Sequence, residues 1–273
     1  MPKLKLFSRW SALLFLSVLA WGGQQGWTKF QHARLCTHEY EPPPPGMVLV
    51  SAGEFLMGSD EPSADPDEKP LRKVFLPAFY IDQFEMTNRR YQEFKKEHRY
   101  PPGEENFPVT FVLKHEAEAY GRWAGKRLPT GAEWEKAARG TDGRVYPWGN
   151  EFKDGYCNIQ ARSNRATAKT PLCKLPGASR GALPGGSFPK GASPYGCEDM
   201  SGNVWEWVSD VWMDKSFPGL RQGGEGRGII RGGGYNYSSL QARASHQGFE
   251  GLGTTCHDVG FRCALDAVPK AKR

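Results

Sequence analysis

Glycine and proline limit how much regular secondary structure this chain can form. The sequence has 33 glycines and 21 prolines among 273 residues, about a fifth of all positions, against roughly 12% in average proteins. Because both residue types favour turns over helix and strand interiors, long helical bundles and coiled coils are excluded. The 15 Phe, 9 Trp and 10 Tyr residues can each bury on the order of 150–250 Å². We therefore expect a loop-rich fold with an aromatic core.

The net charge of +6 is carried by the two ends of the chain. Residues 1–9 contain three basic side chains and no acidic one, and residues 270–273 contain three more basic side chains. The rest of the chain has no net charge. A broad basic surface of the kind that nucleic acids require is therefore not expected, and we predict no nucleic-acid partner.

An uncharged stretch from Trp10 to Trp21 follows the basic start. It is too short to span a bilayer, which takes about 20 apolar residues, but it matches the roughly 7–15 residues of an export signal. Residues 1–22 therefore predict a periplasmic or secreted protein, with either a cleaved signal peptide or an uncleaved membrane anchor. We interpret 23–45 as a Pro-rich linker, because Pro42–Pro45 cannot continue a helix.

The folded part should begin at Gly46 with short strands at 47–50 and 53–58. An acidic loop at 60–68 follows, and its charges indicate a solvated surface. Between about 140 and 196 the periodicity fades and turn-forming residues dominate. A long irregular stretch inside a compact domain is typical of a functional or specially anchored loop region.

Three helices have recognisable ends. Thr87 can cap a helix over 88–98. Thr130 and Glu133 form a capping box for a helix that should run to Arg139. A further helix ending at Gly125 is expected from a buried stripe, which consists of Ala117, Tyr120, Trp123 and Ala124.

The cysteine count favours disulfides over a metal centre. Six cysteines in an exported chain are compatible with disulfide bonds, although six allow fifteen full pairings. The spacing excludes a Cys-x-x-Cys pair, so a zinc site has little support. The cysteines are Cys36, Cys157, Cys173, Cys197, Cys256 and Cys263.

An ordered series of motifs resembles the formylglycine-generating enzyme, or sulfatase-modifying factor, family over residues 46–266. The first motifs are Met47-Val-x-Val-x-x-Gly-x-Phe-x-Met-Gly58, Phe79-Tyr-Ile-Asp82 and Met86-Thr-Asn-x-x-Tyr-x-x-Phe94. The later ones are Tyr146-Pro-Trp-Gly-Asn150, Gly202-Asn-Val-Trp-Glu-Trp207, Arg231-Gly-Gly-Gly-Tyr235 and Gly260-Phe-Arg262. The resemblance implies a single α+β domain related to C-type-lectin-like folds with little regular secondary structure. Residues 267–273 would then form a basic tail, which we expect to be disordered.

Enzymes of this family oxidise a cysteine in an unfolded sulfatase segment to formylglycine, with copper held by two cysteines. Those cysteines lie between the Arg-Gly-Gly and Gly-Phe-Arg motifs. Here the corresponding stretch, Tyr235–Gln247, contains no cysteine, and positions 239–242 and 244–247 offer no copper ligand. We therefore expect no copper and assign no catalytic residue. The resemblance also places Cys263 at a position that is usually part of a structural disulfide.

The resemblance implies a structural calcium site, because calcium accepts six to eight oxygen ligands in irregular loops. In the alternative, no metal binds, and the carboxylates of Asp199 and Glu206 cap turns and pair with arginines. The expected ligands are Asp199, Gly202, Val204 and Glu206, the middle two through main-chain carbonyls.

A groove near the Trp-Glu-Trp motif is the expected place for a substrate or partner, which would be an exported protein or peptide or a small molecule. Core packing for Trp205 and an ion pair for Arg243 remain alternatives. Asn236 begins an N-glycosylation triplet. The candidate binding residues are Trp205, Tyr235, Arg243 and His246.

Three functional interpretations follow. The leading one is an exported accessory or binding protein in envelope protein or metabolite maturation, without formylglycine-generating activity. The second is a periplasmic tailoring oxidoreductase of the same family, which would need another polar cluster, such as Arg243, His246 and Glu250. The third is a lectin-like module whose ligand binding depends on calcium. A shared fold does not decide among them.

Overall fold

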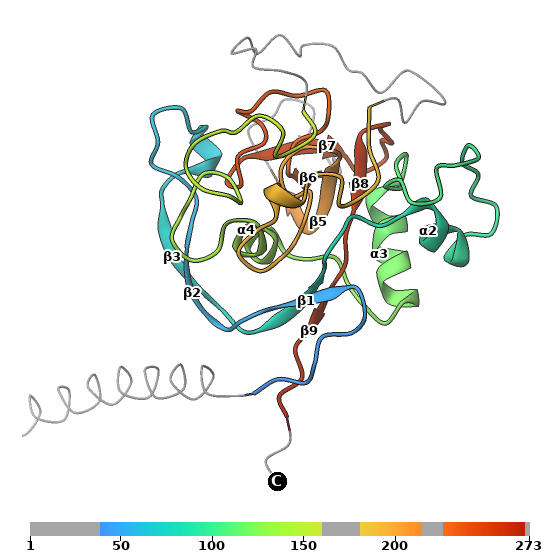
Figure 1. Ribbon diagram of the computed structural model, residues 1–273, viewed down its shortest axis with the longest axis horizontal. Coiled ribbons are helices and arrows are strands. Elements are labelled where there is room, and N and C mark those ends of the chain that lie inside the picture. Colours follow the sequence, from blue (N-terminus) through green and yellow to red (C-terminus); the bar gives the residue numbers. More distant parts are fainter. Residues whose placement is uncertain (1–38, 160–180, 214–225, 271–273) are drawn as a thin grey trace, which may run out of the picture. The chain divides into compact units, whose positions relative to one another are not determined.

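The computed structural model describes residues 39–159, 181–213 and 226–270 (Figure 1). Residues 1–22 and most of the expected linker lie outside these ranges. The chain divides into two compact units, Met1–Tyr40 with Pro269–Arg273, and Glu41–Val268. No helix of the described residues is long and apolar enough to cross a bilayer.

The start of the basic tail is ordered, contrary to expectation. The backbone N–H of Lys270 donates to the carbonyl of Glu39 at 2.8 Å, and Tyr40 forms an antiparallel bridge with Pro269. Backbone pairing therefore extends through Lys270, because an extended partner segment is available to satisfy its polar groups.

The unit Glu41–Val268 contains a three-stranded antiparallel sheet in the order β1-β4-β9. These strands are β1 (Met47–Val50), β4 (Phe79–Asp82) and β9 (Ala264–Asp266). All four residues of β4 are buried, as is expected for the middle strand of a covered sheet. The expected strand at 47–50 is confirmed.

Strand β2 (Gly53–Met57) does not pair with β1, although only two residues separate them. It pairs with β3 (Arg72–Leu76) in an antiparallel ribbon. The loop between β2 and β3 carries the acidic residues and a single 3-10 turn, η1 (Pro66–Glu68). Two strands that are neighbours in sequence thus belong to different sheets.

A four-stranded sheet has the order β7-β6-β5-β8. Its strands are β5 (Trp205–Trp212), β6 (Arg227–Arg231), β7 (Gln247–Gly251) and β8 (Val259–Phe261). The β5–β8 pair is parallel and the others are antiparallel. Glu206 is the register partner of both Arg231 and Gly260, so three sequence motifs meet on adjacent strands.

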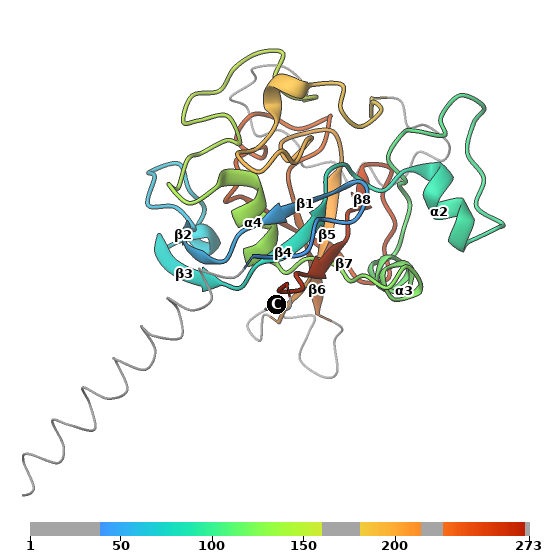
Figure 2. The same ribbon diagram turned by 60° about the horizontal axis from the view of Figure 1, so that its bottom comes forward.

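Three α-helices pack against these sheets. They are α2 (Asn88–Phe94), α3 (Lys114–Trp123) and α4 (Gly131–Arg139), and a second 3-10 turn, η2, covers Pro189–Gly191. The predicted capping box of α4 is confirmed, because Thr130 Oγ1 accepts the Glu133 N–H at 3.1 Å and Glu133 Oε2 accepts the Thr130 N–H at 2.8 Å. In both views α4 lies beside the β2–β3 ribbon (Figures 1 and 2).

Two helix predictions need correction. Helix α2 ends at Phe94, four residues before the expected end. Trp123 is not part of the buried stripe of α3, because 53% of its surface is exposed. Its ring lies against Phe94 at 5.7 Å between centroids, whereas Tyr120 packs more deeply, 5.4 Å from Phe261.

The tryptophans of β5 both belong to the core. Trp205 is 3% exposed and Trp207 is fully buried, with the Trp207 Nε1–H donating to the carbonyl of Val112 at 2.9 Å. A second core cluster surrounds Trp134 on α4. The motif tryptophans therefore mainly pin the sheet to the helices, which explains how so loop-rich a chain retains a packed interior.

Candidate functional site

The acidic loop between β2 and β3 is anchored through Glu68, whose side chain is completely buried. Its Oε1 accepts from Arg243 Nη2 at 2.6 Å, and its Oε2 accepts from the Ser245 hydroxyl at 2.5 Å. Burial would raise the pKa of Glu68, but donors on His246 and Ser245 and the Arg243 charge outweigh burial and lower the pKa to about 2. The loop is therefore pinned at one end and is not simply a solvated surface.

Arg243 is a structural ion-pair residue, which is the alternative that the sequence left open. Its side chain is 5% exposed and also donates to the carbonyls of Leu240 and Ser63. His246 Nδ1 lies 3.2 Å from Asp65 Oδ2 and 3.6 Å from Glu68 Oε1. Arg243 and His246 thus both lie against the Glu68 carboxylate. We call the group of Glu68, Arg243, Ser245 and His246 the loop anchor.

The cluster of Asp65, Glu68 and His246 has the donor types of a metal site. Both lone pairs of Glu68 Oε1 are already used, however, by Arg243 and by the Asp65 backbone N–H at 3.0 Å. A guanidinium so close to the ligand atoms also repels a cation. The cluster is better suited to holding the loop than to holding a metal.

Trp205 and Tyr235 are the other two predicted binding residues. Trp205 touches the loop anchor only through His246, and Tyr235 contacts His257 instead. The Trp205 ring is 5.8 Å from the His246 ring and 5.3 Å from the Tyr237 ring. The Tyr235 hydroxyl is 2.8 Å from His257 Nδ1, and burial together with Asp258 raises the pKa of Tyr235 to about 12. Among the described residues, no hydrogen bond, ion pair or ring contact joins Tyr235 to Arg243 or His246, so the four candidate binding residues do not form one contact cluster.

Two further sequence hypotheses meet obstacles in the packing. Glu250 does not join Arg243 and His246, since its Oε1 accepts the Gly251 N–H at 2.8 Å. Both carboxamide atoms of Asn236 are inaccessible to solvent. The glycosylation triplet is therefore closed in the folded chain.

The predicted calcium ligands lie around a surplus of buried carboxylates. Glu206 is fully buried and binds Arg262 through both oxygens, each at 2.7 Å, and also accepts from Trp134 Nε1 at 2.8 Å. Burial and mutual repulsion raise the pKa of Glu85 and of Asp199. Arg262 is bound to Glu206, and the raised pKa values of Glu85 and Asp199 favour their protonated forms, which lowers the charge left for a cation to balance.

The two main-chain carbonyls among the predicted calcium ligands, those of Gly202 and Val204, are compatible with a cation. Gly202 has φ +80°, and a β-carbon there would lie 2.3 Å from the carbonyl oxygen of Asn158. Within the described ranges, the carbonyl oxygens of Gly202 and Val204 accept no backbone hydrogen bond outside the strands. Asp199 Oδ2 accepts the Gly186 N–H at 2.8 Å and Glu206 is bound to Arg262, as in the alternative without a metal. The two carbonyls and Asp199 Oδ1 are the oxygens of this set that remain for a hard cation. Calcium stays a prediction.

The sulfur atoms of the described residues do not fit copper. Cys157, Cys197 and Cys263 are free and buried, and burial raises the pKa of Cys157 to about 12 and of Cys197 to about 11. Cys263 is a free cysteine, so the disulfide that the resemblance implied there is not formed, and burial raises the pKa of its thiol as well. Cys256 is disulfide-bonded. Protonated or oxidised sulfur is a poor copper ligand, because the thiolate is the binding form.

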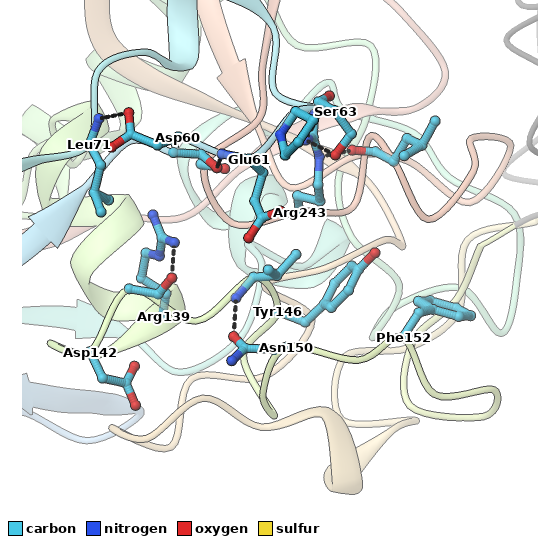
Figure 3. Close-up of a pocket in the computed structure, with 16 residues that line it drawn as sticks. Asp60, Glu61, Ser63, Leu71, Arg139, Asp142, Tyr146, Asn150, Phe152 and Arg243 are labelled. Atoms are coloured by element: carbon cyan, nitrogen blue, oxygen red, sulfur yellow. Dashed lines mark hydrogen bonds between the residues drawn. The ribbon is translucent and has the colours of Figure 1, made fainter.

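A cavity of about 650 Å³ lies beside the anchored acidic loop (Figure 3). Its lining comes from 59–71, from 139–152 and from 240–245. We call it the loop cavity. Its volume falls within the range of small-ligand sites, roughly 300–1,000 Å³. No sequence pattern signals this cavity, because its walls come from segments as distant as those of Ser63 and Arg243, which are 180 residues apart and joined by a hydrogen bond.

Comparison with known proteins supports the resemblance. The sulfatase-modifying factor enzyme 1-like domain matches residues 32–267. The chain is 30% identical to the mouse inactive Cα-formylglycine-generating enzyme 2, over 82% of this chain and 86% of that protein. It is also 30% identical to the mouse formylglycine-generating enzyme, over 82% of this chain and 76% of that one.

A solved structure, PvdO from Pseudomonas aeruginosa, has the same fold with a TM-score of 0.63 and 25% identity, covering 81% of this chain and 94% of that one. The α+β fold with little regular secondary structure is confirmed. The chain belongs to the sulfatase-modifying factor, or formylglycine-generating enzyme-like, family.

Proposed function

We propose that this protein is an exported binding or accessory protein of envelope protein or metabolite maturation, which keeps the family scaffold without generating formylglycine. The observation that carries the proposal is the lack of any cysteine in the Tyr235–Gln247 stretch. Copper(I) favours soft sulfur donors, and hydroxyl, amide or guanidinium groups do not replace them. The one imidazole of this stretch, His246, faces the Asp65 and Glu68 carboxylates and cannot supply a pair of sulfur ligands.

The free thiols in the part of the chain that the structure describes are unsuited to the same role. Cys157, Cys197 and Cys263 are buried, and their raised pKa values keep them protonated at neutral pH. Two of the three lie in or next to a core cluster, away from solvent. Moving either thiol onto the surface would cost core packing, and ionising it in place would leave a thiolate buried away from water.

Identity to relatives does not decide the activity, because an enzyme and an inactive paralogue are equally similar to this chain. The loop cavity favours binding as the retained property. The oxidoreductase interpretation has less support, since Arg243 is saturated by Glu68 and Glu250 is not in the same cluster. A lectin-like role depends on calcium and is tested below.

The decisive experiment incubates the full chain with copper(I), oxygen and a peptide containing Cys-x-Pro-x-Arg, followed by mass spectrometry of the peptide. We expect no conversion, while a formylglycine-generating enzyme converts the same peptide in parallel. Formylglycine in the peptide would overturn the proposal. Cell fractionation tests the expected export, and recovery of the chain in the cytosol would contradict it.

A further inference from the structure

The charges that line the loop cavity are not equivalent, because most of them already have partners. Arg139 is 2% exposed and donates to Glu135 at 2.8 Å, as well as to the carbonyls of Gly58, Gly143 and Arg144. Four of its five N–H groups are therefore in use. Its guanidinium is held as part of the wall and has little capacity for a ligand.

The second guanidinium of the cavity, that of Arg243, and one of its three acids, Asp142, are paired as well. Arg243 donates to Glu68, and Asp142 accepts from Arg144 at 2.7 Å. The Arg243–Glu68 pair is buried and charge-assisted, so it would not open readily for a ligand. Asp142 is exposed, but Arg144 already supplies its counter-charge.

Two carboxylates on the loop remain available. Asp60 uses Oδ1 to accept the Leu71 N–H at 3.0 Å, which leaves Oδ2 free. The Glu61 carboxylate has no hydrogen bond or ion pair with any described residue. In Figure 3 it points between Arg139 and Tyr146, toward the middle of the ring of lining side chains. The cavity thus presents uncompensated negative charge at its mouth.

The walls next to these carboxylates are apolar or aromatic. Tyr146 and Phe152 are in edge contact, with ring centroids 5.6 Å apart, and Tyr146 is also stacked on Trp148 at 5.3 Å. Leu71 and Leu240 line the cavity too. Such walls favour an aliphatic chain, and the faces of aromatic rings attract cations.

The geometry points to a ligand with a primary ammonium group on an aliphatic stem of about four or five carbons, bound in the loop cavity with Glu61 as its counter-ion. Asp60 is the second acceptor, and Phe152 and Leu240 pack on the stem. This inference rests on the proposed function, because it names the chemistry that the binding protein would select. The ammonium group can come from a free amine or from a lysine side chain of an exported protein.

The test measures binding to the full chain by calorimetry and by ligand-observed NMR. Pentylamine and acetyl-Ala-Lys-Ala-amide are the cationic probes. Pentan-1-ol and acetyl-Ala-norleucine-Ala-amide are neutral controls of similar size, and pentanoate is the anionic control. We expect binding of the cationic probes only. The tighter of the two cationic probes distinguishes a free amine from a lysine side chain.

Glu61→Gln keeps the size of the side chain and removes its charge. It should weaken cationic probe binding roughly tenfold to a hundredfold, as expected for a charge-assisted hydrogen bond. Glu93→Gln on α2, an exposed acid outside the cavity, is the matched control and should leave affinity unchanged. Phe152→Ala should weaken pentylamine severalfold while preserving the preference for cations.

Preferential binding of pentanoate would overturn the ligand class and still leave the cavity as a binding site. Absence of binding by every probe, or an unchanged affinity in Glu61→Gln, would overturn the inference. None of these outcomes depends on formylglycine formation in the copper assay, which tests the proposed function separately.

Discussion

Arg243 and Glu68 lie 175 residues apart in sequence, yet their side chains form a buried ion pair with a 2.6 Å contact from Nη2 to Oε1. The pair joins the loop between β2 and β3 to the segment that precedes β7. It also fixes one wall of the loop cavity. The stability of this pair and the shape of the cavity are therefore linked.

Removing one partner of the pair should be costly. Glu68→Gln leaves the buried Arg243 guanidinium with only the exposed Asp65 carboxylate, 4.0 Å away, as a counter-charge. The free energy of unfolding should therefore fall by about 3–5 kcal/mol in urea titrations. Glu54→Gln is the control, because Glu54 forms only an exposed 3.9 Å contact with Lys73 and should change little. Equal stabilities of Glu68→Gln and the wild type would show that the pair is not buried in solution.

The same carboxylate makes stability dependent on acid. The pKa of Glu68 is lowered to about 2 from an ordinary value of 4.5. A folded-state pKa below the unfolded one means that the contribution is complete above about pH 4.5 and is lost as the pH falls toward about 2.

The expected loss through this single group is up to about 3 kcal/mol. Urea titrations at several pH values check it, and the difference between the wild type and Glu68→Gln removes the contribution of all other acids. That difference should shrink steadily below about pH 4.5. A difference independent of pH would contradict the assigned pKa.

Calcium should stabilise the protein if it binds beside Asp199, because it would offset the repulsion that raises the pKa of Asp199 and Glu85. At a free calcium concentration of about 100 times Kd, the gain is about 2.7 kcal/mol, seen as a higher Tm that a chelator reverses. Asp199→Asn should lose most of this response. Asp142→Asn, an exposed acid paired with Arg144, should keep it. A Tm that changes with neither calcium nor chelator would contradict the predicted calcium site.

Gly202 is required by its backbone conformation. At φ +80°, a β-carbon would meet the Asn158 carbonyl oxygen at 2.3 Å, so Gly202→Ala should destabilise the protein by about 1–3 kcal/mol or more. Gly253→Ala is the control, because its β-carbon would have nothing within 4 Å. Thermal unfolding of both variants is the measurement, and similar Tm values would contradict the expected clash.

Local signals in the sequence were sufficient for several elements. The capping box of Thr130 and Glu133 places the start of α4 correctly, because both hydrogen bonds lie within four residues. Trp123 shows the limit of such reasoning. The helical spacing puts it on the stripe of Ala117 and Tyr120, but the core ends before reaching it.

The candidate site was only partly predictable. Arg243 and His246 were selected for binding, and they do lie together, yet on the buried Glu68. Glu68 and Glu61 were both assigned to one solvated loop, although one is fully buried and the other faces a cavity. Residues seven apart in a loop can have opposite environments, since contacts from distant segments decide which side chain is covered.

By itself the sequence determined the family, the loop-rich character and the lack of any cysteine between Tyr235 and Gln247. Motifs, turn-forming residues and the absence of a residue type in a segment can be read directly from the linear sequence. The tertiary structure alone decided which charges are neutralised and where a cavity remains. Burial, ion pairing and free volume depend on groups that chain closure brings together across the whole domain, and no local pattern encodes those meetings.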